Sequence, residues 1–236
     1  MSTILITGAN RGLGLEFARQ YASTGWDVIA TCRDPADAAD LQRLAKASGR
    51  ISIEVLDVTD HEAIDRLAER YRGQALDVLL NNAGIIGPLP IPQNIGLQHF
   101  GQIDYPLWER VLRTNTFAPV KMAEAFLPNL LAGEQKKLVT LSSTVGSIVE
   151  RDTPAMAYAT SKTAVNKAMR LIASQLREQG IIVAIFCPGY VQTRMDFGGA
   201  DLTTEQSVTR LRALIESLTM ADSGSFRRSG GETIAW

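Results

Sequence analysis

The sequence predicts an α/β protein in which a parallel β-sheet carries helices on both faces. Three observations predict this class. Short apolar runs alternate with longer segments of helical periodicity, a glycine-rich turn joins the first run to the first helix, and polar residues follow the ends of several runs. Such alternation is typical of βαβ units. Right-handed crossovers and the early glycine-rich loop narrow the prediction to a doubly wound, Rossmann-type nucleotide-binding fold.

Six apolar runs are expected to form strands, and a short final strand is expected near Phe226. The runs are residues 3–7, 26–31, 51–56, 76–80, 137–141 and 181–186. Helices are expected between them, because apolar residues recur there at helical spacing. The expected helices are residues 12–24, 36–47, 60–71, 107–132, 155–178 and 204–218.

Two irregular stretches, 86–105 and 190–203, interrupt this alternation. Both follow the carboxyl ends of strands, where open α/β sheets bind ligands. Long irregular loops in a compact domain are often functional. We therefore expect these two loops to bind the substrate.

Composition limits the remaining possibilities. The 236 residues are 45% hydrophobic and 21% charged, with a formal net charge of −1. Without a linker or a repeat, residues 1–236 are expected to form a single domain. The charge balance favours neither nucleic acid nor an anionic membrane as a partner.

The few cysteines and histidines predict no metal site. Cys32 and Cys187 are far apart, and His61 and His99 have no ligand-like spacing. The chain starts without the features of a signal peptide, and no apolar run reaches the length of a membrane span. These features predict a cytoplasmic protein.

A glycine-rich loop from Thr7 to Gly14 follows the first predicted strand and opens the first helix. Gly8 allows a tight turn, Gly12 allows the backbone to approach a pyrophosphate, and Gly14 allows close packing of helix on strand. The free N–H groups at the start of the helix favour phosphate. The spacing GxxxGxG therefore favours a dinucleotide site, with an ordinary glycine-rich turn as the alternative.

The end of the second strand distinguishes between the two nicotinamide cofactors. NAD sites usually place a carboxylate there, on the ribose 2′-hydroxyl. Here the strand ends in Cys32-Arg33, and Arg11 in the glycine loop can reach the same region. Two guanidinium groups suit a 2′-phosphate, so NADP(H) is predicted. The alternative is that both arginines are simply solvated.

A candidate catalytic pair lies in the helix expected at 155–178. Tyr158 and Lys162 are four residues apart, so they share one face of that helix. A nearby cation favours the phenolate form of tyrosine, and a lowered pKa suits proton exchange with an alcohol or carbonyl. Further polar groups end strands at the same edge of the sheet: Ser142 and Ser143, the Asn-Asn-Ala-Gly segment at 81–84, and Cys187-Pro188-Gly189.

Taken together, these motifs resemble the short-chain dehydrogenase/reductase family over essentially the whole chain. The family's TGxxxGxG loop matches residues 7–14, its NNAG motif matches 81–84, and its helix asparagine matches Asn115. Its serine matches Ser143, its YxxxK pair matches Tyr158 and Lys162, and its PG motif matches 188–189, followed by Thr193. The loop and the C-terminal residues are most similar to the C-factor-like and carbonyl-reductase-like branch. The segment between serine and tyrosine is slightly longer than in many members, which leaves Ser142 as an alternative to Ser143.

The resemblance implies a role for each matching residue. Ser143 polarises the substrate oxygen, Tyr158 exchanges a proton with it, and Lys162 lowers the pKa of Tyr158 and binds the nicotinamide ribose. Asn115 holds a water in a proton relay with Lys162. The implied cofactor-binding residues are Gly8, Asn10, Arg11, Gly12, Leu13, Gly14, Arg33, Asp57, Val58, Asn82, Ala83, Gly84, Tyr158, Lys162, Pro188, Gly189, Val191 and Thr193.

The predicted function is that of an NADP(H)-dependent carbonyl reductase or alcohol dehydrogenase acting on a small-molecule carbonyl or alcohol. The family's common assembly makes a homodimer the expected state, with a monomer or a tetramer as alternatives. A cofactor-binding signalling protein of the C-factor type, in which catalysis matters little, is the alternative function. A sugar-nucleotide epimerase generally needs a larger C-terminal region than 236 residues provide.

Overall fold

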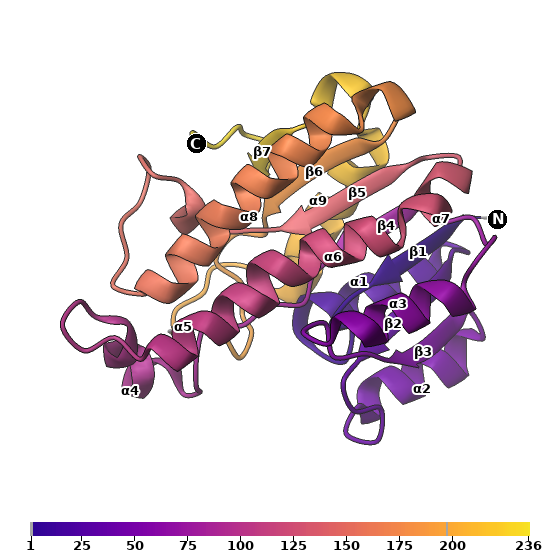
Figure 1. The fold of residues 1–236 in the computed structure, drawn as a ribbon. Coiled ribbons are helices and arrows are strands. Elements are labelled where there is room, and N and C mark those ends of the chain that lie inside the picture. The colour runs from indigo at the N-terminus through magenta and orange to yellow at the C-terminus, as the bar shows by residue number, and fades with distance from the viewer. Residues whose placement is uncertain (1, 197) are drawn as a thin grey trace.

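A computed structural model describes residues 2–196 and 198–236 of the chain (Figure 1). Its strands form one sheet, in which every neighbouring pair is parallel and the order is β3-β2-β1-β4-β5-β6-β7. The strands are β1 (Thr3–Ile6), β2 (Asp27–Cys32), β3 (Ile51–Val55), β4 (Val78–Asn81), β5 (Lys137–Leu141), β6 (Ile182–Cys187) and β7 (Ser225–Arg228). The order reverses direction next to β1, as in doubly wound folds. The predicted fold class is confirmed.

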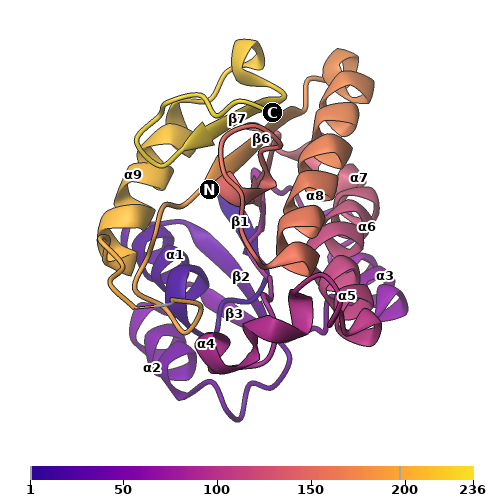
Figure 2. The same cartoon turned by 90° about the vertical axis from the view of Figure 1, so that its left-hand side faces the viewer.

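Helices cover both faces of the sheet (Figure 2). One layer contains α1 (Gly12–Ser23), α2 (Ala39–Ser48) and α9 (Thr204–Ser217). The other contains α3 (His61–Arg70), α5 (Tyr105–Leu112), α6 (Ala118–Ala125), α7 (Leu127–Ala132) and α8 (Met156–Gln175). The sheet therefore has a hydrophobic core on each side.

Strand β1 shows how one short apolar run contributes side chains to both cores. Successive side chains of a strand point to opposite faces. Ile4 and Ile6 belong to the core beneath α1 and α9, whereas Leu5 belongs to the core beneath α3, α6 and α8. All three side chains are fully buried. A strand covered on both faces reads as a continuous apolar run, which is why the sequence predicts it clearly.

The helix expected at 107–132 is not continuous. It consists of α5, a π-helical segment η2 (Arg113–Phe117), α6 and α7. Pro119 lacks the N–H that would bond to the carbonyl of Asn115, and Pro128 interrupts the helix again at the start of α7. The π-turn thus contains Asn115, the asparagine expected within this helix.

Other differences are confined to the ends of elements and to the first irregular loop. Helix α2 begins at Ala39, three residues later than expected, after a turn in which the Asp34 carboxylate accepts from the Ala36 N–H. The stretch 86–105 contains two short helical segments, α4 (Ile91–Asn94) and η1 (Ile95–Gln98). Helix α8 is followed by a separate turn, η4 (Arg177–Gln179).

Candidate active site

A cavity of about 1890 Å³ lies at the carboxyl edge of the sheet. Its walls come from the segments that follow β1, β2, β3, β4, β5 and β6, together with the first turns of α1 and α8. Because carboxyl ends of parallel strands meet at one edge, segments that are distant in sequence converge there. This is the edge at which the sequence predicts the ligand site.

The glycine loop forms one end of this cavity. Gly8 and Gly12 have φ angles of 68° and 55°, which favour glycine. A Cβ atom at Gly14 would lie 2.3 Å from the Gly8 carbonyl oxygen, so only glycine fits there. Helix α1 starts without a side-chain cap and without an acidic residue in its first turn. Its N–H groups and partial positive charge are available to a phosphate.

The Asn81–Gly84 segment is fastened to the glycine loop by Thr7. The Thr7 hydroxyl accepts from the backbone N–H groups of Asn82 and Ala83, both at 3.0 Å. In return, the Asn82 side chain donates to the carbonyl oxygens of Thr7 and Gly8, at 2.8 and 3.1 Å. The Asn82 side chain therefore holds the loop in shape, and Ala83 and Gly84 line the cavity.

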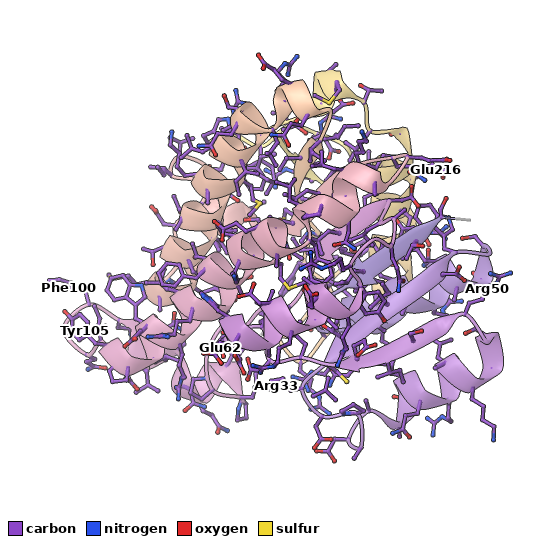
Figure 3. All side chains as sticks on the ribbon, turned by 45° about the vertical axis from the view of Figure 1, so that its right-hand side comes forward. Arg33, Arg50, Glu62, Phe100, Tyr105 and Glu216 are labelled. Carbon is purple, nitrogen blue, oxygen red and sulfur yellow. The ribbon has the colours of Figure 1, made fainter. Side chains whose placement is uncertain are left out.

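Three arginines meet near the glycine loop. Arg11 and Arg33 both line the cavity, as predicted from the sequence, and Arg194 joins them from the segment after β6. Burial lowers the pKa of Arg11, and the positive charges of Arg194 and Arg33 lower it further. Among the described residues, no carboxylate forms an ion pair with any of the three. Like charges gathered without counter-ions favour an anion as ligand. Arg33 is labelled in Figure 3.

Thr193 and Asp57 both line the cavity. A Cβ atom at Gly12 would lie 3.7 Å from the Thr193 methyl group, so the segment after β6 closes against the glycine loop. Pro188 is fixed by the Ser207 hydroxyl of α9, which donates to its carbonyl oxygen at 2.7 Å. The Asp57 carboxylate accepts from the N–H and the hydroxyl of Thr59, at 2.9 and 2.7 Å.

Tyr158 and Lys162 both line the cavity from the first turns of α8. The Lys162 ammonium lies 5.6 Å from the centre of the Tyr158 ring and donates to the Leu141 carbonyl oxygen at 2.9 Å. Burial lowers the pKa of Lys162 to about 8. Burial also raises the pKa of Tyr158, and a hydrogen bond with the Ser143 side chain opposes that rise. The pKa shift of Tyr158 is opposite in direction to the expected one, because the loss of hydration outweighs the hydrogen bond with Ser143.

Ser143 lies between the fifth strand and the tyrosine. Its side chain accepts from the Val145 N–H at 3.4 Å and makes the hydrogen bond with Tyr158. The Ser142 hydroxyl is buried and has no hydrogen-bond partner within the described residues. Contact with the phenol therefore favours Ser143 over Ser142 as the serine that acts with Tyr158.

Asn115 lies behind the cavity and does not line it. It is 1% exposed, and its side chain accepts from the Ile85 N–H at 2.9 Å and donates to the Ile85 carbonyl at 2.8 Å. The amide also donates to the Ser161 hydroxyl at 3.0 Å. These bonds tie the chain after β4 to helix α8. The role expected for Asn115 in a proton relay with Lys162 stays a prediction.

The structure brings every other predicted site residue to the wall of this cavity. These residues are Gly8, Asn10, Arg11, Gly12, Leu13, Gly14, Arg33, Asp57, Val58, Asn82, Ala83, Gly84, Ser143, Tyr158, Lys162, Pro188, Gly189, Val191 and Thr193. Sequence reasoning missed Arg194, although a third arginine beside the Thr193 motif was visible. Within residues 2–196 and 198–236, no cluster of acidic, histidine or cysteine side chains could hold a metal ion, and no helix is long and apolar enough to cross a membrane.

Comparisons with known proteins agree with this geometry. The family model described as short chain dehydrogenase matches residues 2–199. The chain is 34% identical over 244 residues to a 1-hydroxy-2-glutathionyl-2-methyl-3-butene dehydrogenase of Rhodococcus sp. (strain AD45), with all of both chains covered. It is 32% identical over 162 residues to the C-signal protein of Myxococcus xanthus, covering 68% of this chain and 93% of that protein. An NADPH-bound carbonyl reductase from chicken fatty liver superposes with a TM-score of 0.89 at 33% identity, covering 100% of this chain and 99% of that one.

Proposed function

The chain belongs to the short-chain dehydrogenase family and is an oxidoreductase of that family, and from this premise we propose that it is an NADP(H)-dependent carbonyl reductase. In this proposal Tyr158 donates a proton to the substrate oxygen, and Ser143 holds that oxygen by a hydrogen bond. When bound, the nicotinamide cofactor supplies the hydride. Residues 1–236 act as one domain, with 86–105 and 190–203 as its substrate loops.

The observation that carries this proposal is the environment of Tyr158. Its side chain lines the cavity, its pKa is raised by burial, and it shares a hydrogen bond with Ser143. A phenol with a raised pKa keeps its proton at neutral pH. The hydrogen bond with Ser143 places that proton beside the group that would hold the substrate oxygen, so the phenol can pass it to a carbonyl that receives a hydride. Lys162, on the next turn of α8, supplies a positive charge that favours the phenolate left behind.

The preference for NADP(H) over NAD(H) is supported by the three arginines. Arg11, Arg33 and Arg194 face the same end of the cavity as the start of α1. A 2′-phosphate adds two negative charges that NAD(H) lacks, and guanidinium groups bind phosphate by charge-assisted hydrogen bonds. The carbonyl reductase from chicken fatty liver, which superposes over the whole chain, is NADPH-bound.

The decisive experiment follows NADPH consumption with a panel of aldehydes and quinones. The panel also includes alcohols bearing a glutathionyl group, assayed with NADP⁺, because a relative acts on such a compound. We expect Tyr158→Phe to lose about 10²- to 10⁴-fold in kcat, the usual contribution of a general acid, while NADPH binding persists. Tyr71→Phe, at a tyrosine outside the cavity lining whose hydroxyl donates to Glu54, is the matched control and should keep full activity.

Two results would contradict the proposal. One is a wild-type protein that binds no NADPH. The other is a Tyr158→Phe variant that turns over as fast as the wild type, because the phenol would then have no part in proton transfer.

A signalling role is the second candidate, favoured by similarity to the C-signal protein over 68% of the chain. A protein of this kind would bind NADPH but consume none with any member of the panel. Retention of Ser143, Tyr158 and Lys162 together at one cavity wall supports the reductase instead.

We also propose that the protein forms a homodimer. Helix layers on one side of the sheet carry exposed apolar side chains, among them Phe117 of η2 and Leu171 of α8. Pairing two such layers would remove this surface from water. Sedimentation equilibrium tests the proposal, and a monomer at all accessible concentrations would contradict it.

A further inference from the structure

Gln98 is a buried polar residue in the first substrate loop. It is the last residue of η1 and is 2% exposed, whereas its neighbours His99 and Phe100 point into solvent. Figure 3 shows Phe100 at the outer end of the molecule, near Tyr105. A buried amide in an otherwise exposed loop needs a reason, because an unpaired amide is costly to bury.

The reason lies in two hydrogen bonds that use both ends of the amide. Its oxygen accepts from the backbone N–H of Tyr158 at 3.0 Å. Its nitrogen donates to the carbonyl oxygen of Ile86 at 2.7 Å. Ile86 follows the Asn81–Gly84 segment that lines the cavity. One side chain therefore connects the wall after β4 to the backbone of the proposed proton donor.

Helix α8 needs this bond because its own sequence provides no cap. The first N–H groups of a helix have no partner inside the helix, and a side chain usually accepts from the third residue. Here the residue before the helix is Ala155, which makes no side-chain cap, and Tyr158 is the third residue. The Gln98 oxygen, 60 positions earlier in the chain, takes the place of the missing cap.

We propose that Gln98 is a positioning residue that sets the place of the Tyr158 phenol and couples it to the first substrate loop. This inference rests on the proposed function of Tyr158. A shift of about 1 Å in a reacting group can cost on the order of 10²-fold in rate. Loss of the Gln98 bond would free the first turn of α8 and let the phenol move relative to Ser143 and Lys162.

The rest of the helix has independent attachments, so the change should stay local. The Trp108 indole donates to the Thr160 hydroxyl at 2.9 Å, and Asn115 donates to the Ser161 hydroxyl at 3.0 Å. The Thr116 hydroxyl donates to the Ser161 carbonyl at 2.9 Å. These bonds hold the second turn of α8 when the first is released.

The first test replaces the amide with an apolar side chain of the same length. Gln98→Met is compared with Gln179→Met, which makes the same change at an exposed glutamine in the turn η4, outside the cavity lining. We expect Gln98→Met to lower kcat about 10- to 100-fold. KM for NADPH should change less than about twofold, because the arginines and the glycine loop are untouched. Gln179→Met should match the wild type.

A second measurement detects the hydrogen bond itself and does not depend on catalytic turnover. Labelling with ¹⁵N-tyrosine gives five backbone signals, one for each tyrosine. The Tyr158 signal is identified by its absence in Tyr158→Phe. We expect its amide hydrogen to exchange at least about tenfold faster in Gln98→Met than in the wild type. The Tyr21 and Tyr71 amides should exchange at unchanged rates, because they lie outside this contact.

A third test measures how the activity of Gln98→Glu depends on pH. A protonated carboxyl copies the amide, with one oxygen that accepts from Tyr158 and one O–H that donates to Ile86. The ionised carboxylate cannot donate, and it places a negative oxygen against the Ile86 carbonyl oxygen. The activity of Gln98→Glu relative to wild type should therefore rise as the pH is lowered, and the ratio for Gln98→Met should stay constant.

These outcomes separate the positioning role from the proposed function. A wild-type protein without reductase activity defeats the proposed function, and the exchange measurement then still decides whether Gln98 holds Tyr158. An active wild type with an equally active Gln98→Met, or an unchanged exchange rate at Tyr158, overturns the role of Gln98. A folded Gln98→Met with both effects, beside an unaffected Gln179→Met, supports it.

Discussion

At the scale of single residues, Tyr158 and Lys162 differ in how close their pKa values lie to neutral pH. Burial raises the pKa of the phenol, so Tyr158 keeps its proton throughout the physiological range. Burial lowers the pKa of Lys162 to about 8, so the amine changes charge just above that range. The ammonium, not the phenol, is therefore the group whose titration should be visible in the rate.

Reductase activity should fall as the pH rises through about 8. Below that value Lys162 carries the positive charge that favours the developing phenolate, and above it the amine is neutral. The measurement is kcat/KM for a carbonyl substrate between pH 6 and pH 10, a range set on the order of two units around the pKa. Lys162→Arg keeps its charge throughout and should give a lower rate with a flat profile over this range. A wild-type profile that is flat across pH 8 would contradict the assignment.

Single residues also show what the sequence could predict. Tyr158, Lys162 and the glycines stand in spaced motifs whose chemistry is local, and the structure brings them to one cavity. Gln98 and Arg194 stand in stretches without periodicity. Their partners, Tyr158 and Arg11, lie 60 and 183 positions away. Only the folded chain brings such pairs together, so their roles could not be predicted from spacing.

At the scale of elements, Thr7 joins the end of β1 to the end of β4. Its buried hydroxyl accepts from two N–H groups, those of Asn82 and Ala83. Valine has the same shape without the hydroxyl. Thr7→Val should therefore leave both N–H groups unpaired and lower the free energy of unfolding by about 1–3 kcal/mol per group.

Urea denaturation measures this loss, and NADPH titration measures its effect on the glycine loop. Thr7→Ser keeps the hydroxyl and should recover most of the stability. Equal stability of Thr7→Val and Thr7→Ser would mean that the hydroxyl bonds contribute little.

The elements also show where periodicity was misleading. Apolar spacing predicted one helix over 107–132, whereas the chain forms α5, the π-turn η2, α6 and α7 there. Pro119 and Pro128 were the local signals for the breaks. In the sheet, by contrast, every expected strand is present, because strands covered on both faces are apolar throughout.

At the scale of the whole molecule, cofactor binding should be coupled to folding. The cavity is assembled from segments between Gly8 and Glu232, so an unfolded chain has no site. NADPH at about 100 times its Kd should add about 2.7 kcal/mol to the free energy of unfolding, which raises the Tm by on the order of 5 °C.

NADH at the same concentration should raise the Tm less, because it lacks the 2′-phosphate. Arg194→Gln should reduce the difference between the Tm increases that NADPH and NADH produce. Arg177→Gln, in the turn before β6, should leave that difference unchanged. Equal Tm shifts with NADPH and NADH in the wild type would refute the phosphate site.

The turn η4, at the edge of the sheet away from the cavity, offers a place to anchor the protein. Cys32 and Cys187 are both buried, and Glu178 in this turn is exposed. A thiol introduced by Glu178→Cys could be coupled selectively to a dye, an electrode or a resin. The tethered molecules would share one orientation, in which the opening of the cavity faces the surrounding solution.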